Sequence, residues 1–139
     1  MFKKILVPVD VSVEGDTRKL LQKTKTLTQG WDCEIHVLTV IPNVGMPIVG
    51  SYFDEDVVDE GRKAVIETLA QALESEGLAA KQHVLSGTVY DRVIGLASKL
   101  DADLIVIGAH QPELRDYLLG SNAARVVRHS NRSVLVIRD

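Results

Sequence analysis

The chain alternates short apolar runs with longer stretches in which apolar residues recur about every 3.6 positions. The short runs hold Val, Ile and Leu at consecutive positions, which is typical of strands that are covered on both faces. The longer stretches have the spacing of amphipathic helices, and turn-forming residues separate several of them from the strands. We expect strands at residues 2–9, 33–41, 81–86, 103–107 and 133–138, and helices at residues 17–28, 54–76, 88–100 and 120–130.

This alternation predicts a single α/β domain. A strand, a helix and a further strand in succession favour a parallel sheet with helices on both faces. We therefore expect a doubly wound, Rossmann-like sheet of five parallel strands, and we assume the strand order 3-2-1-4-5. Ligands of such sheets bind beyond the carboxyl ends of the strands, where the order reverses. The loops after Val9 and after Ile107 should then face each other across a binding site.

The segment between Gly108 and Asn122 carries the clearest functional signal. It follows an apolar strand and ends at Gly120 and Ser121, which open a predicted helix. The unpaired N–H groups and the partial positive charge of a helix N-terminus suit an anion such as phosphate. Ser121 could contact that anion or serve only as the N-cap, and Gly108 could serve the site or only allow close packing.

Other polar residues near these loops have more than one reading. Asp10 could belong to the site, could help to hold a metal, or could form only an Asx turn after the first strand. His110 could contact a ligand or be solvated, and Arg115, the cation of this loop, could pair with phosphate or merely be solvated. Thr88 to Asp91 resembles a capping box, so we expect the Gly87–Thr88 turn to cap a helix rather than to bind an anion.

Composition narrows the classes of partner. A net charge of −3 argues against binding to the nucleic-acid backbone, and an aromatic content of 4% argues against a base-stacking platform. Pro8 and Asp10 interrupt the apolar start, so we interpret it as a strand and not as a signal peptide. No segment is long enough to cross a bilayer, and we expect a cytoplasmic protein. The single cysteine, Cys33, is expected to be a small core residue.

Several longer matches point to one family. They include Lys4–Asp10, Ile105–Gly108, Leu118–Asn122 and Ser133–Ile137. On these segments the chain resembles the universal stress protein family over essentially its whole length. The ATP-binding branch of that family carries the motif Gly-x2-Gly-x9-Gly-Ser/Thr. Here Gln111 replaces the second glycine, and the spacing from that position to the last glycine is one residue shorter.

The resemblance implies a nucleotide site. It places adenine near Val9, Asp10 and Val40, ribose near Gly108, and phosphates near the start of the last helix. ATP, with or without Mg²⁺, is the implied ligand, and a sensor or regulator of the stress response is the implied role. The residues expected to bind the nucleotide are Pro8, Val9, Asp10, Val40, Ile107, Gly108, His110, Gln111, Arg115, Gly120, Ser121 and Asn122.

No motif predicts a dedicated enzyme, and slow hydrolysis of ATP stays open. The chain has no P-loop signature, no nucleophile elbow and no acid–base pair at a suggestive spacing, so we assign no catalytic residue. His36, His83 and His129 are scattered without metal-ligand spacing, so we expect no metal site.

The resemblance also implies a homodimer, which forms through the last strand, Ser133 to Ile137. An apolar edge strand invites pairing with another chain. The loop at residues 42–53 could fold over adenine as a lid. Because Gln111 replaces a glycine, the alternative function is a dimeric stress protein that acts through partner contacts without a nucleotide.

Overall fold

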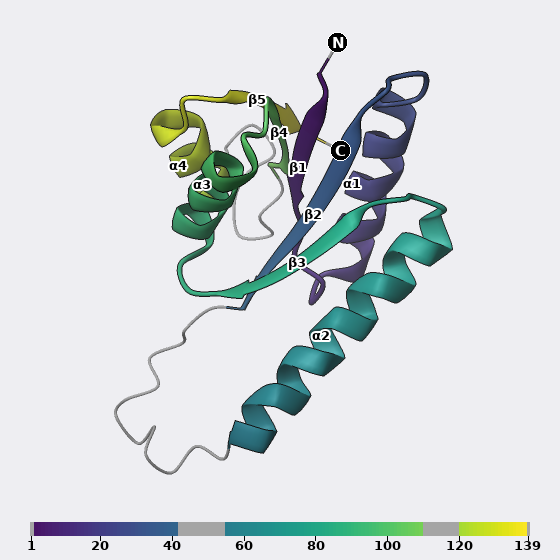
Figure 1. The fold of residues 1–139 in the computed structure, drawn as a ribbon, viewed down its shortest axis with the longest axis vertical. Helices are drawn as coiled ribbons and strands as arrows, with labels where there is room; N and C mark the ends of the chain where they lie inside the picture. The colour runs from purple at the N-terminus through teal and green to yellow at the C-terminus, as the bar shows by residue number, and fades with distance from the viewer. Residues whose placement is uncertain (1, 42–54, 110–119, 139) are drawn as a thin grey trace.

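The computed structural model describes residues 2–41, 55–109 and 120–138, which form strands and helices in alternation (Figure 1). In chain order the elements are β1 (Lys4–Pro8), α1 (Glu14–Leu27), β2 (Glu34–Ile41), α2 (Glu55–Glu76), β3 (Lys81–Ser86), α3 (Val89–Leu100), β4 (Leu104–Gly108), α4 (Ser121–His129) and β5 (Ser133–Ile137).

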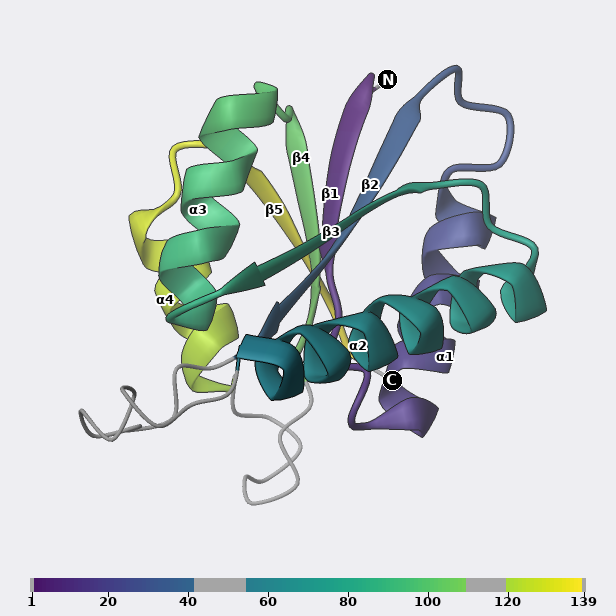
Figure 2. The same cartoon turned by 60° about the horizontal axis from the view of Figure 1, so that its bottom comes forward.

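The strands form one parallel sheet in the order β3-β2-β1-β4-β5. β1 lies at its centre, where Ile5 is opposite Ile35 of β2 on one side and Leu104 of β4 on the other. Figures 1 and 2 show α1 and α2 on one face of the sheet and α3 and α4 on the other. The predicted fold class and the assumed strand order are confirmed.

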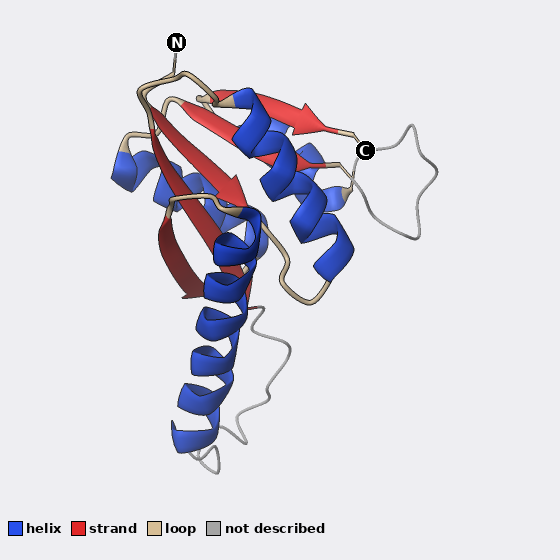
Figure 3. Cartoon of the chain, turned by 90° about the vertical axis from the view of Figure 1, so that its right-hand side faces the viewer, coloured by secondary structure: helices blue, strands red, loops and turns tan. Residues whose placement is uncertain are grey.

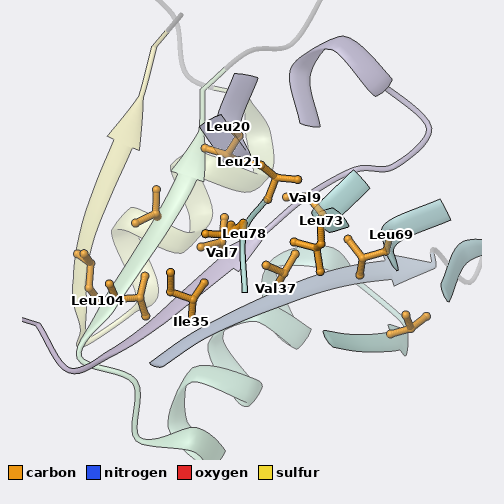
Figure 4. Packing of buried hydrophobic residues seen from close by; sticks show 13 residues of the cluster. Val7, Val9, Leu20, Leu21, Ile35, Val37, Leu69, Leu73, Leu78 and Leu104 are labelled. Carbon is orange, nitrogen blue, oxygen red and sulfur yellow. The ribbon is translucent and has the colours of Figure 1, made fainter. Parts of the chain in front are cut away.

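Successive residues of β1 supply two separate core layers. Ile5 and Val7 pack with buried leucines of α1 and α2, whereas Leu6 packs beneath α3 and α4. Figure 4 shows the first layer, in which Leu21 and Leu69 approach the sheet from the two helices. Because both faces are covered, the central strands are apolar at consecutive positions.

α1 begins at Glu14, earlier than residue 17 where the apolar pattern predicted it. Val13 is the N-cap and offers no side-chain capping bond, so the sequence carries no start signal there. The chain is turned instead by a bond from the Val13 N–H to the Asp10 carbonyl at 3.1 Å. Glu14 and Asp16 lie in the first turn, where negative charge suits the helix dipole.

The end of α2 and the start of α3 are the two places where the sequence predicted a helix cap. Gly77 follows α2 with a φ of 65°, which agrees with its predicted place just after the helix. Figure 3 shows the N-terminal part of α2 extending beyond the sheet. Thr88 is the N-cap of α3 as expected, but its side chain makes no capping hydrogen bond. The Arg92 side chain braces that turn instead, by donating from Nε to the Ser86 carbonyl at 2.7 Å.

Candidate functional site

A cavity of about 550 Å³ opens at the carboxyl ends of the central strands. It lies where β1 leads into α1 on one face of the sheet and β4 leads toward α4 on the other, which is the expected switch point. The volume is within the range of roughly 300–1,000 Å³ that is usual for small-molecule sites. The cavity wall includes Pro8, Val9, Asp10, Val40, Ile107, Gly108, Gly120, Ser121 and Asn122.

All predicted binding residues that the structure describes therefore lie around one cavity. His110, Gln111 and Arg115 fall outside the described residues, as does the expected lid at residues 42–53. Their part in the site stays a prediction.

Asp10 forms a tightly bonded turn at the end of β1. Its carboxylate Oδ1 accepts from the backbone N–H of Ser12 at 3.0 Å and from the Ser12 hydroxyl at 2.5 Å. Its carbonyl accepts from the Val13 N–H at 3.1 Å and from the Thr17 hydroxyl at 2.5 Å. The Asx-turn reading is thus correct, and both lone pairs of this carbonyl are used. The Asp10 carbonyl therefore has no lone pair left for a ligand, and a further role of Asp10 in the site stays a prediction.

Val40 offers backbone groups in the right direction. The Val9 N–H donates to the Leu38 carbonyl at 2.8 Å, so Leu38 bonds toward β1. In a parallel ladder alternate residues of a strand bond to the same neighbour, so the peptide groups of Val40 also face the β1 side. β1 ends at Pro8 and the chain then leads into α1, so the end of β2 at Val40 borders the cavity.

The other end of the cavity is the N-terminus of α4. Gly120 is the N-cap and Ser121 is the first helical residue, so the N-cap reading of Ser121 is wrong. The Gly120 N–H bonds to the Ala109 carbonyl at 3.2 Å, which brings the helix start beside the end of β4. The N–H groups of the first turn have no intrahelical acceptor and carry partial positive charge. This end can therefore hold an anion.

Gly108 is not required by packing against α1. A Cβ built at this position would lie 3.8 Å from Cδ2 of Leu20, which is an ordinary van der Waals distance. The close-packing reading of Gly108 therefore has no support from this contact. A cavity-facing role at the end of β4 stays a prediction.

The sequence interpretation missed some of the residues that line the cavity. Lys19 and Lys23 lie on α1 beside it, and their spacing with Asp16 along the helix could have shown that they share a face. Thr39 also lines it and is 4% exposed, and its hydroxyl has no hydrogen-bond partner among the described residues. Its signal was a hydroxyl in the otherwise apolar second half of β2.

Two of the histidines that we expected to be scattered, His36 and His83, are in contact. Nδ1 of His36 lies 2.8 Å from Nε2 of His83, and the Nε2 atom of His36 lies 3.0 Å from Oε1 of Glu34. Burial, together with the charges of His36, Lys81 and Lys99, lowers the pKa of His83. The parallel register of β2 and β3 brings the two rings together, and strand register was not visible in the sequence. Neither ring lines the cavity.

Cys33 is half-buried at the edge of the first core layer. Burial and the carboxylate of Asp32 raise the pKa of its thiol. Across residues 2–41, 55–109 and 120–138, no three His, Cys, Asp or Glu side chains are grouped so that they could hold a metal ion. No helix in the described part of the chain is long and apolar enough to span a membrane.

Known proteins resemble the chain along its whole length. Residues 1–138 match the universal stress protein family. Universal stress protein G of Shigella flexneri is 35% identical over 144 residues, which cover 99% of this chain and 100% of that protein. Universal stress protein UspA from Lactobacillus plantarum has the same fold, with a TM-score of 0.79 at 22% identity over 98% of this chain and 97% of that one.

One similar structure holds a nucleotide. The universal stress protein from Archaeoglobus fulgidus in complex with dAMP has a TM-score of 0.67 and 25% identity, over 97% of each chain. The family match covers far more than half of the sequence, and the fold agrees with it. The chain therefore belongs to the universal stress protein family.

Proposed function

We propose that this protein binds an adenine nucleotide, with ATP as the expected ligand, in the cavity at the carboxyl edge of the sheet. The observation that carries the proposal is the convergence of the β1, β2 and β4 ends with the α4 N-terminus on one cavity. The dAMP complex of a family member supports the same ligand class.

The two ends of the cavity suit the two ends of a nucleotide. Phosphate would lie at the start of α4, where Ser121 adds a hydroxyl and Asn122 an amide to the partial positive charge of the helix N-terminus. The base would lie between Val9 and Val40, whose apolar side chains and backbone groups suit a flat heterocycle. Because no protein metal site is grouped among the described residues, Mg²⁺ would enter mainly through the phosphates.

The proposed role of the bound nucleotide is a signal in a sensor or regulator. The competing function is a partner-binding protein that needs no nucleotide. The two differ in whether adenine nucleotides bind to the purified protein.

Asn122→Asp tests the proposal because it places a negative charge where phosphate should lie. We expect isothermal calorimetry to show affinity for ATP at least about tenfold weaker than that of the unaltered protein, since like charges repel at the helix start. Asn131→Asp makes the same charge change in the exposed turn after α4 and should leave the affinity unchanged. Equal ATP affinity in the two variants would contradict the phosphate position, and no binding in the unaltered protein would favour the partner-binding function.

We further propose that the protein forms a homodimer through β5, and the two sheet edges support this assignment. At the end of β3, the Gly87 N–H bonds to the Ile41 carbonyl of β2 at 3.0 Å. Successive residues of a strand point their backbone groups to opposite sides, so the carbonyls of Val84 and Ser86 point away from β2, toward the open edge of the sheet. Arg62 donates to the first of these and Arg92 to the second. Such side chains block strand pairing.

The β5 edge lacks this protection within the described residues. No arginine or lysine of residues 2–41, 55–109 or 120–138 bonds to a β5 carbonyl in the structure, although Lys23 reaches the Arg138 carbonyl beyond the strand. The Ala109 N–H bonds to the Ile137 carbonyl, so the backbone groups of Ile137 point toward the β4 side. The N–H and carbonyl of the preceding residue, Val136, therefore point toward the open edge of the sheet.

Val136→Pro removes one outward N–H from this edge without removing a bond to β4. We expect light scattering to show a monomer for Val136→Pro and a dimer for the unaltered protein. Gln82→Pro makes the matched change on the guarded edge and should remain a dimer. The assignment fails if Gln82→Pro, and not Val136→Pro, dissociates the dimer while circular dichroism shows both variants folded.

A further inference from the structure

A hydrogen-bonded chain of side chains crosses from β2 to β3 beneath α3. Glu34 and His36 share one face of β2, and His83 lies diagonally across on β3. The two imidazole rings stack at a centroid distance of 5.1 Å with 26° between their planes. His36 is only 3% exposed and His83 is partly exposed, so the bond joins a buried ring to a ring that solvent can reach.

The chemistry of the pair limits how many protons it can hold. Nε2 of His36 faces a carboxylate oxygen of Glu34, so it carries the proton, and a neutral His36 leaves Nδ1 bare. Nε2 of His83 then donates to that bare nitrogen across 2.8 Å. One added proton leaves this bond intact, because one of the two facing nitrogens can still be bare. A second added proton puts N–H on both, which removes the bond and brings two positive charges together.

Nearby charges act on the two protonation steps in opposite directions. The carboxylate of Glu34 favours the first proton, and a hydrogen bond from Lys81 lowers the pKa of Glu34 and keeps it ionised. Ammonium groups disfavour the second proton. Among the described residues, the charged groups around the pair are Glu34 on β2, Lys4 opposite it on β1, Lys81 on β3 and Lys99 on α3.

The pair ties down the part of β3 that has the fewest other attachments. Lys81 and Gln82 are exposed, whereas the end of β3 is held by Arg62, by Arg92 and by the bond from Gly87. Apart from the ladder, the first half of β3 is joined to β2 by the imidazole bond and by the Lys81–Glu34 ion pair at 2.6 Å. An exposed ion pair of this kind contributes little by itself.

We propose that the His36–His83 pair is a proton-sensitive latch, which holds the first half of β3 on β2 and releases it when both imidazoles are protonated. The latch acts on an edge strand, and β2 continues from His36 to Val40 at the cavity. It does not depend on nucleotide binding, so it can be tested without a ligand.

Amide hydrogen exchange followed by NMR on the full chain tests the latch. Because the pKa of His83 is lowered, the second protonation falls below the ordinary histidine range. Between about pH 7 and about pH 4, the protection factor at His83 should therefore fall at least about tenfold more than those of β4, after correction for intrinsic exchange. His83→Gln keeps a side-chain N–H that can donate to His36 but cannot titrate, so it should abolish this extra loss. His129→Gln removes an exposed histidine at the end of α4 and should retain the loss.

A histidine titration of the unaltered protein by ¹⁵N NMR gives a second readout that needs no variant. The latch predicts that His36 and His83 titrate as a coupled pair in two separated steps. Independent single-step titration of the two rings would overturn the proposal. An acid-induced loss of protection that is equal in all strands, or that persists in His83→Gln, would overturn it as well.

Discussion

At the scale of single residues, the protein contains polar groups whose environment departs from the usual rule that buried polar atoms are paired. Thr39 is the clearest case, because it is buried opposite Val84 of β3 and its hydroxyl has no partner in the described part of the chain. A buried hydroxyl that lacks a hydrogen bond is unfavourable by roughly 1–3 kcal/mol. Because the hydroxyl makes no hydrogen bond in the described part of the chain, we expect it to contribute nothing to the stability of the unliganded fold. The residue also lines the cavity.

Replacing Thr39 by Val should therefore stabilise the protein. We expect the free energy of unfolding in urea to rise by about 1 kcal/mol, since the shape is kept and the unpaired group is lost. Thr39→Ser keeps the hydroxyl, removes a buried methyl group and should be less stable than the unaltered protein by about 1 kcal/mol. A Val variant that is less stable would show that the hydroxyl has a partner in solution.

Asp103 is the opposite case, because both oxygens of its carboxylate accept hydrogen bonds. It accepts from the backbone N–H groups of Lys3 and Lys4, each at 2.9 Å, and so holds the start of β1. Burial alone would raise the pKa of Asp103, but these two bonds, the backbone N–H of Asp103 itself and the charge of Lys3 together outweigh it and hold the pKa below its ordinary value. Stability from a lowered carboxylate pKa is present above the ordinary value and is lost as the pH falls through the lowered one.

Asp103→Ala should lower the free energy of unfolding by roughly 1–2 kcal/mol at neutral pH, because two charge-assisted bonds are lost. The difference from the unaltered protein should shrink as the pH falls below the usual range of aspartate. Urea unfolding at several pH values measures it. A difference that stays constant down to about pH 2 would show that the carboxylate charge plays no part.

At the scale of elements, hydrophobic periodicity predicted which segments form strands and helices, but it did not predict how they begin. The Asx turn at Asp10 and the Thr88 cap of α3 were among the predicted readings, but the start of α1 at Glu14 and the bond from Arg92 to Ser86 have no signature in the sequence. The histidine pair was missed for a related reason. A contact between β2 and β3 depends on register, and a strand that is apolar at consecutive positions lacks the alternation from which register could be predicted.

Gly87, in the turn before α3, and Gly95, within α3, give opposite predictions. Gly87 has a φ of 136°, and a Cβ there would lie 2.6 Å from Nε of Arg92, whereas Gly95 has open space within α3. Gly87→Ala should lower the free energy of unfolding by roughly 1–3 kcal/mol through backbone strain. Gly95→Ala should raise it by about 0.5–1 kcal/mol, since alanine is the better helix former. Thermal unfolding of both variants checks the pair, and two changes of the same sign would contradict this account.

At the scale of the whole molecule, the carboxyl edge of the sheet is where the fold and the proposed function meet. The alternation of elements was enough to predict the parallel sheet, and an assumed strand order was enough to place Val9 near Gly108. The sequence could not show that α1 contributes Lys19 and Lys23 to the same cavity, because that depends on how the helix packs across β4. It also could not show that one sheet edge is guarded by two arginines.

The most direct test of the central claim is a backbone ¹⁵N NMR titration of the protein with ATP. At up to about 1 mM ATP, we expect saturable shift changes at Val9, Asp10, Val40, Gly108 and the first turn of α4, with GTP weaker. These residues come from four elements and meet only at the cavity, so their joint response would locate the nucleotide there. Unchanged spectra, or shifts confined to another surface, would contradict the proposed site.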